Sequence, residues 1–242
     1  MRILITNDDS IYSEGLWILA EAAKPYGEVV VVAPKNEQSA KSHAINVRSG
    51  FPIEVFEGRF GVLSYTVDSS PADAVRAAYY ALNLDFDLVL SGVNSGFNVG
   101  EDILYSGTVA AATEAVLLGK KAIAFSVAPQ DFATARTHVP TVLADIFQNK
   151  LLNEGDLFNV NIPKNPQAMK ITKQGKTYFD TRFEEEQGLY YQRGVHRYHL
   201  EEDCESDTWA IAHHLTSLSP LTIKRIDFQV LQKILEKTTT KA

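Results

Sequence analysis

This 242-residue chain has only one cysteine, no membrane-spanning apolar run and no excess of positive charge. Its single cysteine, Cys204, excludes an internal disulfide and a multi-cysteine zinc site. No stretch approaches the roughly 20 apolar residues of a membrane span. The opening MRILITNDDS is too soon interrupted by acids for a signal peptide. We therefore expect a soluble cytoplasmic protein with no membrane partner.

The charge balance is acidic, with 23 Lys and Arg against 30 Asp and Glu, a formal net charge of −7. This balance argues against binding to nucleic acid polymers. Acids concentrate between Asp180 and Asp207, where nine of them face three arginines. Such a segment is typical of a solvated arm, and an oligomer contact that masks some of the charges is the alternative.

The first two thirds of the chain alternate short apolar runs with helical patterns, which predicts an α/β fold built on a mostly parallel sheet with helices on both faces. Runs such as RILIT and VVVVA have the composition of buried parallel strands. We expect strands at 2–6, 29–33, 88–91 and 122–126, and helices at 14–26, 70–82, 108–118 and 131–148, with shorter β segments within 44–67.

The last third is more aromatic and charged. FNVNI at 158–162 predicts a further strand, and 178–200 a β-hairpin arm with turns at Gly188 and Gly194. Asp207 is expected to cap a short helix, and Phe228, Leu231 and Leu235 to form one face of a C-terminal helix. Because no linker or repeat interrupts the chain, we expect one domain over 1–242.

Polar residues follow the predicted strands at 7–9, 36–39 and 91–98, and at 105–108, where the alanine-rich helix begins. Ligands bind beyond the carboxyl ends of the strands in parallel sheets, so these four clusters should meet at one edge. The organisation of the fold therefore predicts one polar site there.

Asp8 and Asp9 are adjacent acids directly after a buried strand, where a cation would compensate their repulsion and lost solvation. Helix capping is the alternative. Ser39 and Asn94 add a hydroxyl and an amide oxygen, although each alone is also a common turn residue. An all-oxygen set suits Mg²⁺, Mn²⁺ or Ca²⁺ better than zinc, so we expect one divalent cation.

Ser106, Gly107 and Thr108 stand at the expected start of a helix, where backbone N–H groups can hold a phosphate. The alternative is an ordinary helix cap. The histidines add little: His196 and His199 should face opposite sides of a strand, and His43 is at most a minor substrate contact.

The chain resembles the SurE family, stationary-phase survival proteins that act as 5′(3′)-nucleotidases. The resemblance lies in ILITNDD, VAPKNEQSA, LSGVNSGFNVGEDILYSGTVAAATEA, LFNVNIP and ESDTWA, and extends from residue 1 to about 220. It implies hydrolysis of nucleoside monophosphates, a Rossmann-like core, and dimers or tetramers built with an arm of about 176–242.

By position, the resemblance implies metal ligation by Asp8, Asp9, Ser39 and Asn94. It also implies phosphate contacts from Asn98 and from the 106–108 segment.

Three residues depart from the family pattern, because Ser10, Ala40 and Ser42 stand where glycine is usual. Their side chains should restrict positive φ, which leaves the loop geometry and the substrate preference open.

A mechanism follows as a hypothesis: a bound cation offsets the acids, and one aspartate, preferably Asp8, orients or deprotonates the attacking water. Direct attack by this carboxylate stays open. A broad acid phosphatase or exopolyphosphatase using the same site is the nearest alternative. A phospho-receiver domain is disfavoured because Ser91-Gly92 ends the strand where it needs an aspartate, and a redox dinucleotide domain because NDDSIYSEG lacks its glycine pattern.

Overall fold

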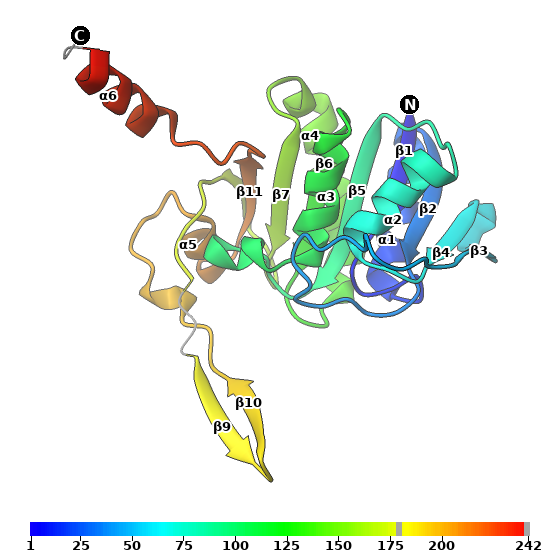
Figure 1. Cartoon of the computed structure of the whole chain (residues 1–242), viewed down its shortest axis with the longest axis horizontal. Helices are drawn as coiled ribbons and strands as arrows, with labels where there is room; N and C mark the ends of the chain where they lie inside the picture. The colour runs from blue at the N-terminus through cyan, green and yellow to red at the C-terminus, as the bar shows by residue number, and fades with distance from the viewer. Residues whose placement is uncertain (178–180, 240–242) are drawn as a thin grey trace.

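In a computed structural model, residues 1–177 and 181–239 are described, and they form a nine-stranded sheet and a separate two-stranded hairpin (Figure 1). The sheet order is β3-β4-β2-β1-β5-β6-β7-β11-β8. Its strands are β1 (Arg2–Thr6), β2 (Glu28–Pro34), β3 (Ile53–Phe56), β4 (Ser64–Val67), β5 (Leu88–Ser95), β6 (Lys121–Val127), β7 (Leu157–Ile162), β8 (Ala168–Ile171) and β11 (Leu215–Leu221).

The predicted α/β class is confirmed. The six central strands are parallel to one another, in the order β4, β2, β1, β5, β6 and β7, whereas β3 runs antiparallel to β4 and β11 antiparallel to β7. The principal helices are α1 (Glu14–Ala23), α2 (Pro71–Arg76), α3 (Gly107–Leu117) and α4 (Phe132–Gln148). A π-helical turn at Ala77–Ala81 extends α2 to the expected end near residue 82.

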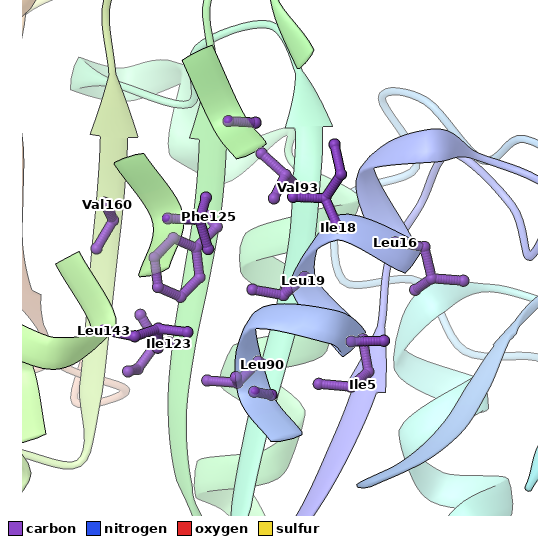
Figure 2. Close-up of a cluster of buried hydrophobic side chains, with 14 of the residues drawn as sticks. Ile5, Leu16, Ile18, Leu19, Leu90, Val93, Ile123, Phe125, Leu143 and Val160 are labelled. Atoms are coloured by element: carbon purple, nitrogen blue, oxygen red, sulfur yellow. The ribbon is translucent and has the colours of Figure 1, made fainter. Parts of the chain in front are cut away.

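Two apolar cores lie on opposite faces of the sheet, as the continuous apolar character of its central strands requires. One packs α1 and α4 against the sheet, with Leu16, Leu19 and Phe125 fully buried (Figure 2). The other packs the alanine-rich faces of α2 and α3. Both cores hold the central strands rigidly, so the loops after β1 and β5 have fixed starting points.

The C-terminal part departs from several expectations. Strands β8 and β11 were not predicted. In β11 (LTSLSPL), Thr, Ser and Pro separate the leucines, so the sequence lacks the continuous apolar run of a buried strand. Helix α5 (Asp207–Ala212) is capped by Ser206, whose hydroxyl accepts from the Trp209 N–H at 3.1 Å, so the prediction that Asp207 is the cap was wrong.

The predicted hairpin is formed by β9 (Arg182–Glu186) and β10 (Leu189–Arg193), although its expected start at 178–180 lies outside the described residues. His196 follows the strand and His199 lies in the 3₁₀ helix η6 (Tyr198–Leu200), so their placement on one strand was wrong. The hairpin and helix α6 (Phe228–Thr239) extend away from the sheet (Figure 1).

In ranges 1–177 and 181–239, no helix combines the length and apolarity needed to cross a membrane.

Candidate active site

Side chains from three separate strand ends line one cavity of about 620 Å³. Asp8 and Asp9 follow β1, Ser39 lies in the loop after β2, and Asn94 is near the end of β5. Strands β2, β1 and β5 are adjacent and parallel, so their carboxyl ends lie at one edge of the sheet. The predicted meeting of these side chains is therefore observed, and Asn98 and Ser106 line the same cavity.

Asp8 is the most perturbed carboxyl group of the cavity, at 4 % exposed. Burial raises its pKa to about 6, and the neighbouring Asp9 adds to the rise. The hydroxyl of Thr108 donates a hydrogen bond to Asp8 Oδ1 and opposes the shift. A buried carboxylate next to a second one is a local excess of negative charge that a cation would relieve.

Asp9 and Glu37 interact as like charges in the cavity, and Ser39 contacts Glu37. Burial also raises the pKa of Asp9, with a contribution from Glu37, whereas the Ser95 N–H donates to Asp9 Oδ2 at 3.3 Å and lowers it. The Ser39 hydroxyl donates to Glu37 Oε1 at 2.6 Å. Glu37 was missed as a cavity residue, although its place beside Ser39 in the sequence was a usable signal.

The side-chain oxygen of Asn94 is available as a ligand because its side-chain nitrogen is already hydrogen-bonded. Its Nδ2 donates to the Gly96 carbonyl at 2.8 Å. A carbonyl can only accept, so this contact fixes the orientation of the amide and leaves Oδ1 as the free acceptor. Among the described residues no cluster of three or more His, Cys, Asp or Glu side chains could hold a metal. A cation here therefore depends on the neutral oxygens of Ser39 and Asn94 as well as the aspartates.

The start of α3 lies directly against Asp8. The Ser106 hydroxyl accepts from the Val109 N–H at 3.1 Å, so the capping interpretation holds for this side chain. A Cβ at Gly107 would lie 2.8 Å from Asp8 Cβ, which explains the glycine by close approach. Because the Thr108 hydroxyl and the Thr108 N–H both bind the Asp8 carboxylate, and the Val109 N–H is bonded to Ser106, the Gly107 N–H is the first-turn group left for an anion. The phosphate contacts stay a prediction.

Asn98 is held by two asparagines that sequence reasoning missed. Its N–H donates to Asn161 Oδ1 at 2.8 Å, and its carbonyl accepts from Asn159 Nδ2 at 2.7 Å and Asn161 Nδ2 at 3.0 Å. Both asparagines are fully buried in β7. Two asparagines at alternate positions of an apolar strand share one face, so FNVNI did contain a signal. The side-chain amide of Asn98 contacts Ser126 Oγ at 2.8 Å. A hydroxyl can accept from the amide nitrogen or donate to the amide oxygen, so it suits either orientation of the amide.

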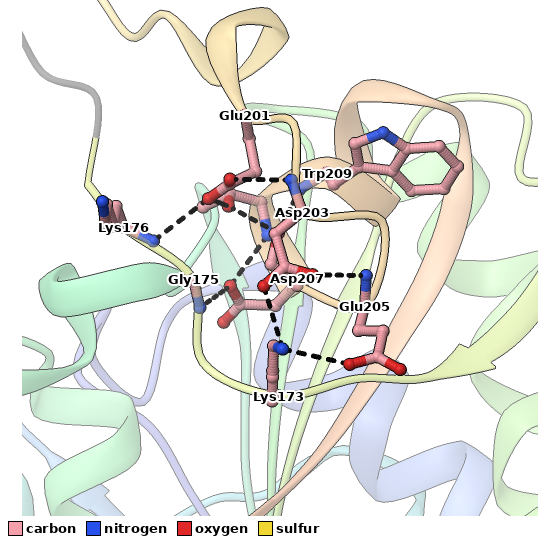
Figure 3. A network of polar contacts seen from close by, with 10 residues as sticks. Lys173, Gly175, Lys176, Glu201, Asp203, Glu205, Asp207 and Trp209 are labelled. Carbon is pink, nitrogen blue, oxygen red and sulfur yellow. Dashed lines mark hydrogen bonds and ion pairs between the residues drawn. The ribbon is translucent and has the colours of Figure 1, made fainter.

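A second polar network surrounds Asp207 and its contact with Gly175 (Figure 3), and Asp207 also binds the loop between Asn98 and Ser106. The buried Asp207 carboxylate accepts from the Gly100 N–H at 3.0 Å and the Gly175 N–H at 2.8 Å. Gly100 begins the 3₁₀ helix η4 (Gly100–Leu104) that leads to the start of α3. Asp207 of the ESDTWA motif thus holds this loop in place through Gly100.

Ser10, Ala40 and Ser42 adopt φ values of 84°, 56° and 53°. The expected restriction therefore does not prevent the glycine-like conformation, and non-glycine residues hold it at a cost in strain.

His43 lies 2.8 Å from Glu114 Oε2 and does not line the cavity, whereas His196, which was discounted, does.

The comparisons with known proteins decide the family. The family model of "Survival protein SurE" matches residues 3–181. The chain belongs to the SurE family. A "5′-nucleotidase SurE" from Clostridium botulinum (strain Alaska E43 / Type E3) is 36 % identical over 251 residues, covering 97 % of this chain and 98 % of that protein. A second SurE relative, "5′-nucleotidase SurE" from Pelobacter propionicus (strain DSM 2379 / NBRC 103807 / OttBd1), is 43 % identical over 189 residues, 74 % of each chain. The solved structure "Crystal Structure of Sure Protein from Aquifex aeolicus" has a TM-score of 0.80 at 33 % identity, covering 97 % of this chain and 98 % of that one.

Proposed function

We propose that this SurE protein is a divalent-metal-dependent phosphomonoesterase that hydrolyses nucleoside 5′-monophosphates to nucleoside and phosphate. Relatives named 5′-nucleotidase SurE along nearly the whole chain support the reaction. The observation that carries the proposal is the shared cavity of Asp8, Asp9, Ser39 and Asn94 beside the start of α3.

These four residues are the proposed ligands of Mg²⁺, Mn²⁺ or Ca²⁺, since hard cations prefer carboxylate, hydroxyl and amide oxygens. The raised pKa values of both aspartates and the free Oδ1 of Asn94 suit such an ion. When bound, the cation supplies positive charge to the phosphate and lowers the pKa of a coordinated water.

The remaining chemistry belongs to the side chains and backbone. Asp8, with Oδ1 held by Thr108, orients the attacking water and accepts its proton while the P–O5′ bond breaks, and that proton is then passed to the leaving nucleoside oxygen. If the carboxylate itself attacks phosphorus, the same bond breaks, the leaving oxygen takes a proton from solvent, and water then hydrolyses the aspartyl phosphate. The Gly107 N–H and the side-chain amide of Asn98, whose backbone is held by Asn159 and Asn161, stabilise charge on the transferring phosphoryl group.

A substrate panel with chelation tests the proposal. Purified protein is assayed on adenosine 5′-monophosphate (AMP), 3′-AMP, p-nitrophenyl phosphate and tripolyphosphate, with EDTA and with each metal added back. AMP should be hydrolysed best, and only with metal. Faster turnover of tripolyphosphate would favour the exopolyphosphatase alternative.

Asp8→Asn and Asn94→Ala should each abolish metal-dependent hydrolysis while the fold is kept. The exposed Asp85→Asn and Asn149→Ala are matched controls that should retain activity. Full activity in either site variant would remove that residue from the scheme.

We also propose that 1–242 is one cytoplasmic domain that forms a homodimer or homotetramer through residues of about 176–242. Exposed apolar side chains on both parts of this arm support an interface; they are Phe183, Leu189, Tyr190, Phe228, Leu231 and Leu235. Light scattering of the full chain and of a variant with Phe228→Glu and Leu231→Glu tests it. A monomeric wild type would contradict the proposal.

A further inference from the structure

A second hollow, of about 640 Å³, opens directly beside the catalytic cavity. The two are continuous, because Ala40, Asp102, Tyr105 and His196 line both. The remaining wall of the second hollow comes from Glu101, Thr177, Thr181 and Gln192. A substrate whose phosphate lies at the start of α3 therefore has space to extend towards the base of the hairpin.

The chemistry of these walls fits an uncharged group with a flat ring. No lysine or arginine is among the described residues that line either hollow, and the second carries the two carboxyl groups of Glu101 and Asp102. A further phosphate chain would meet these acids without a lysine or arginine among the described lining residues to offset them. Burial raises the pKa of Asp102, and its interaction with His196 opposes that rise. Tyr105, by contrast, is an aromatic residue that is 62 % exposed.

The backbone holds Tyr105 between the two hollows. Its N–H donates to the Asp102 carbonyl at 3.0 Å, and its carbonyl accepts from the Ser42 N–H at 3.0 Å. Glu101 Oε2 accepts from the Thr177 N–H at 3.1 Å, which ties the same turn to the segment before the hairpin. The ring thus has a fixed starting point next to the place where phosphate would bind.

We propose that this hollow binds the nucleoside of the substrate, with the base stacked on Tyr105 and a ribose hydroxyl donating to the Asp102 carboxylate. This assignment rests on the proposed nucleotidase function and extends it to specificity. An aromatic face attracts any base, and a carboxylate accepts from sugar hydroxyls. The acidic walls then favour monophosphates over polyphosphate chains.

Paired substrates test the assignment. Kinetics are measured on AMP and ribose 5-phosphate for the wild type, Tyr105→Ala and the control Tyr80→Ala, whose tyrosine is 59 % exposed and lines neither hollow. The kcat/KM ratio of AMP to ribose 5-phosphate should fall about tenfold in Tyr105→Ala, mainly through KM, which is the scale of base stacking on an aromatic residue. It should not change in Tyr80→Ala.

A second pair of substrates tests the contact between Asp102 and the ribose hydroxyls. In Asp102→Asn, the ratio of kcat/KM for AMP to kcat/KM for its 2′,3′-dideoxy analogue should fall about fivefold. Equal losses on AMP and ribose 5-phosphate in Tyr105→Ala, or an unchanged dideoxy ratio in Asp102→Asn, would overturn the nucleoside site while leaving the nucleotidase function intact. Absence of AMP turnover by the wild type with metal would instead overturn the proposed function itself.

Discussion

Replacing Asp8 by asparagine should remove activity and, without metal, stabilise the fold. Burial raises the pKa of Asp8 from 3.8 to about 6, so the folded chain holds this proton more tightly than the unfolded chain. The protonated carboxyl favours folding below about pH 4, and that contribution is lost as the pH rises through about 6.

The size of the effect follows from the pKa change. One pKa unit corresponds to about 1.4 kcal/mol, so the rise from 3.8 to about 6 makes a penalty of about 3 kcal/mol at neutral pH. Asparagine has nearly the same shape, can still accept from the Thr108 hydroxyl through Oδ1, and carries no charge to desolvate. For a chain of this length such a change raises Tm by roughly 6 to 12 °C.

Thermal unfolding followed by circular dichroism in EDTA tests this at pH 4.5 and 7.5. The Tm difference between Asp8→Asn and wild type should be large at pH 7.5 and much smaller at pH 4.5. Asp9→Asn, which replaces a less buried acid, should show a smaller difference. A destabilised Asp8→Asn protein at pH 7.5, or the same difference at both pH values, would refute the reasoning.

Three further changes test other parts of the structure. Ala40→Gly should raise the free energy of unfolding by about 1 kcal/mol in urea titrations, because φ is 56° there; an unchanged or lower value would contradict the strain argument. Gly107→Ala should reduce AMP turnover about 100-fold or more, because the new Cβ would lie 2.9 Å from Asp8 Oδ2; near-normal kcat would show that the contact is unimportant. Asn161→Ala should lower the free energy of unfolding by roughly 1 to 3 kcal/mol, because it leaves the buried Asn98 N–H without its acceptor; wild-type stability would exclude this clamp.

Much of the sheet was predictable because its central strands are short, continuous apolar runs. RILIT and VVVVA, bounded by polar residues or proline, have the pattern of strands buried on both faces. Once the strands are parallel, the meeting of Asp8, Ser39 and Asn94 follows from topology alone. The metal-site hypothesis could therefore be made from the strand topology, without the positions of the side-chain atoms.

Other features depend on neighbours that a sequence pattern does not reveal. Strand β11 is half polar and enters antiparallel beside β7, so its period could not be read from LTSLSPL. The role of Asn159 and Asn161 depends on β7 lying next to the loop that carries Asn98. The second hollow is assembled from residues far apart in the sequence, whose proximity is a tertiary property; they are Ala40, Glu101, Asp102, Tyr105, Thr177, Thr181, Gln192 and His196.

The most direct test of the account is AMP hydrolysis by exhaustively chelated protein before and after adding back Mn²⁺ or Mg²⁺, compared for wild type and Asn94→Ala. The account predicts no turnover without metal, full recovery in the wild type on add-back, and little recovery in the variant at the same metal concentration. Turnover that survives chelation, or equal recovery in Asn94→Ala, would contradict a cation held by oxygens from separate strand ends.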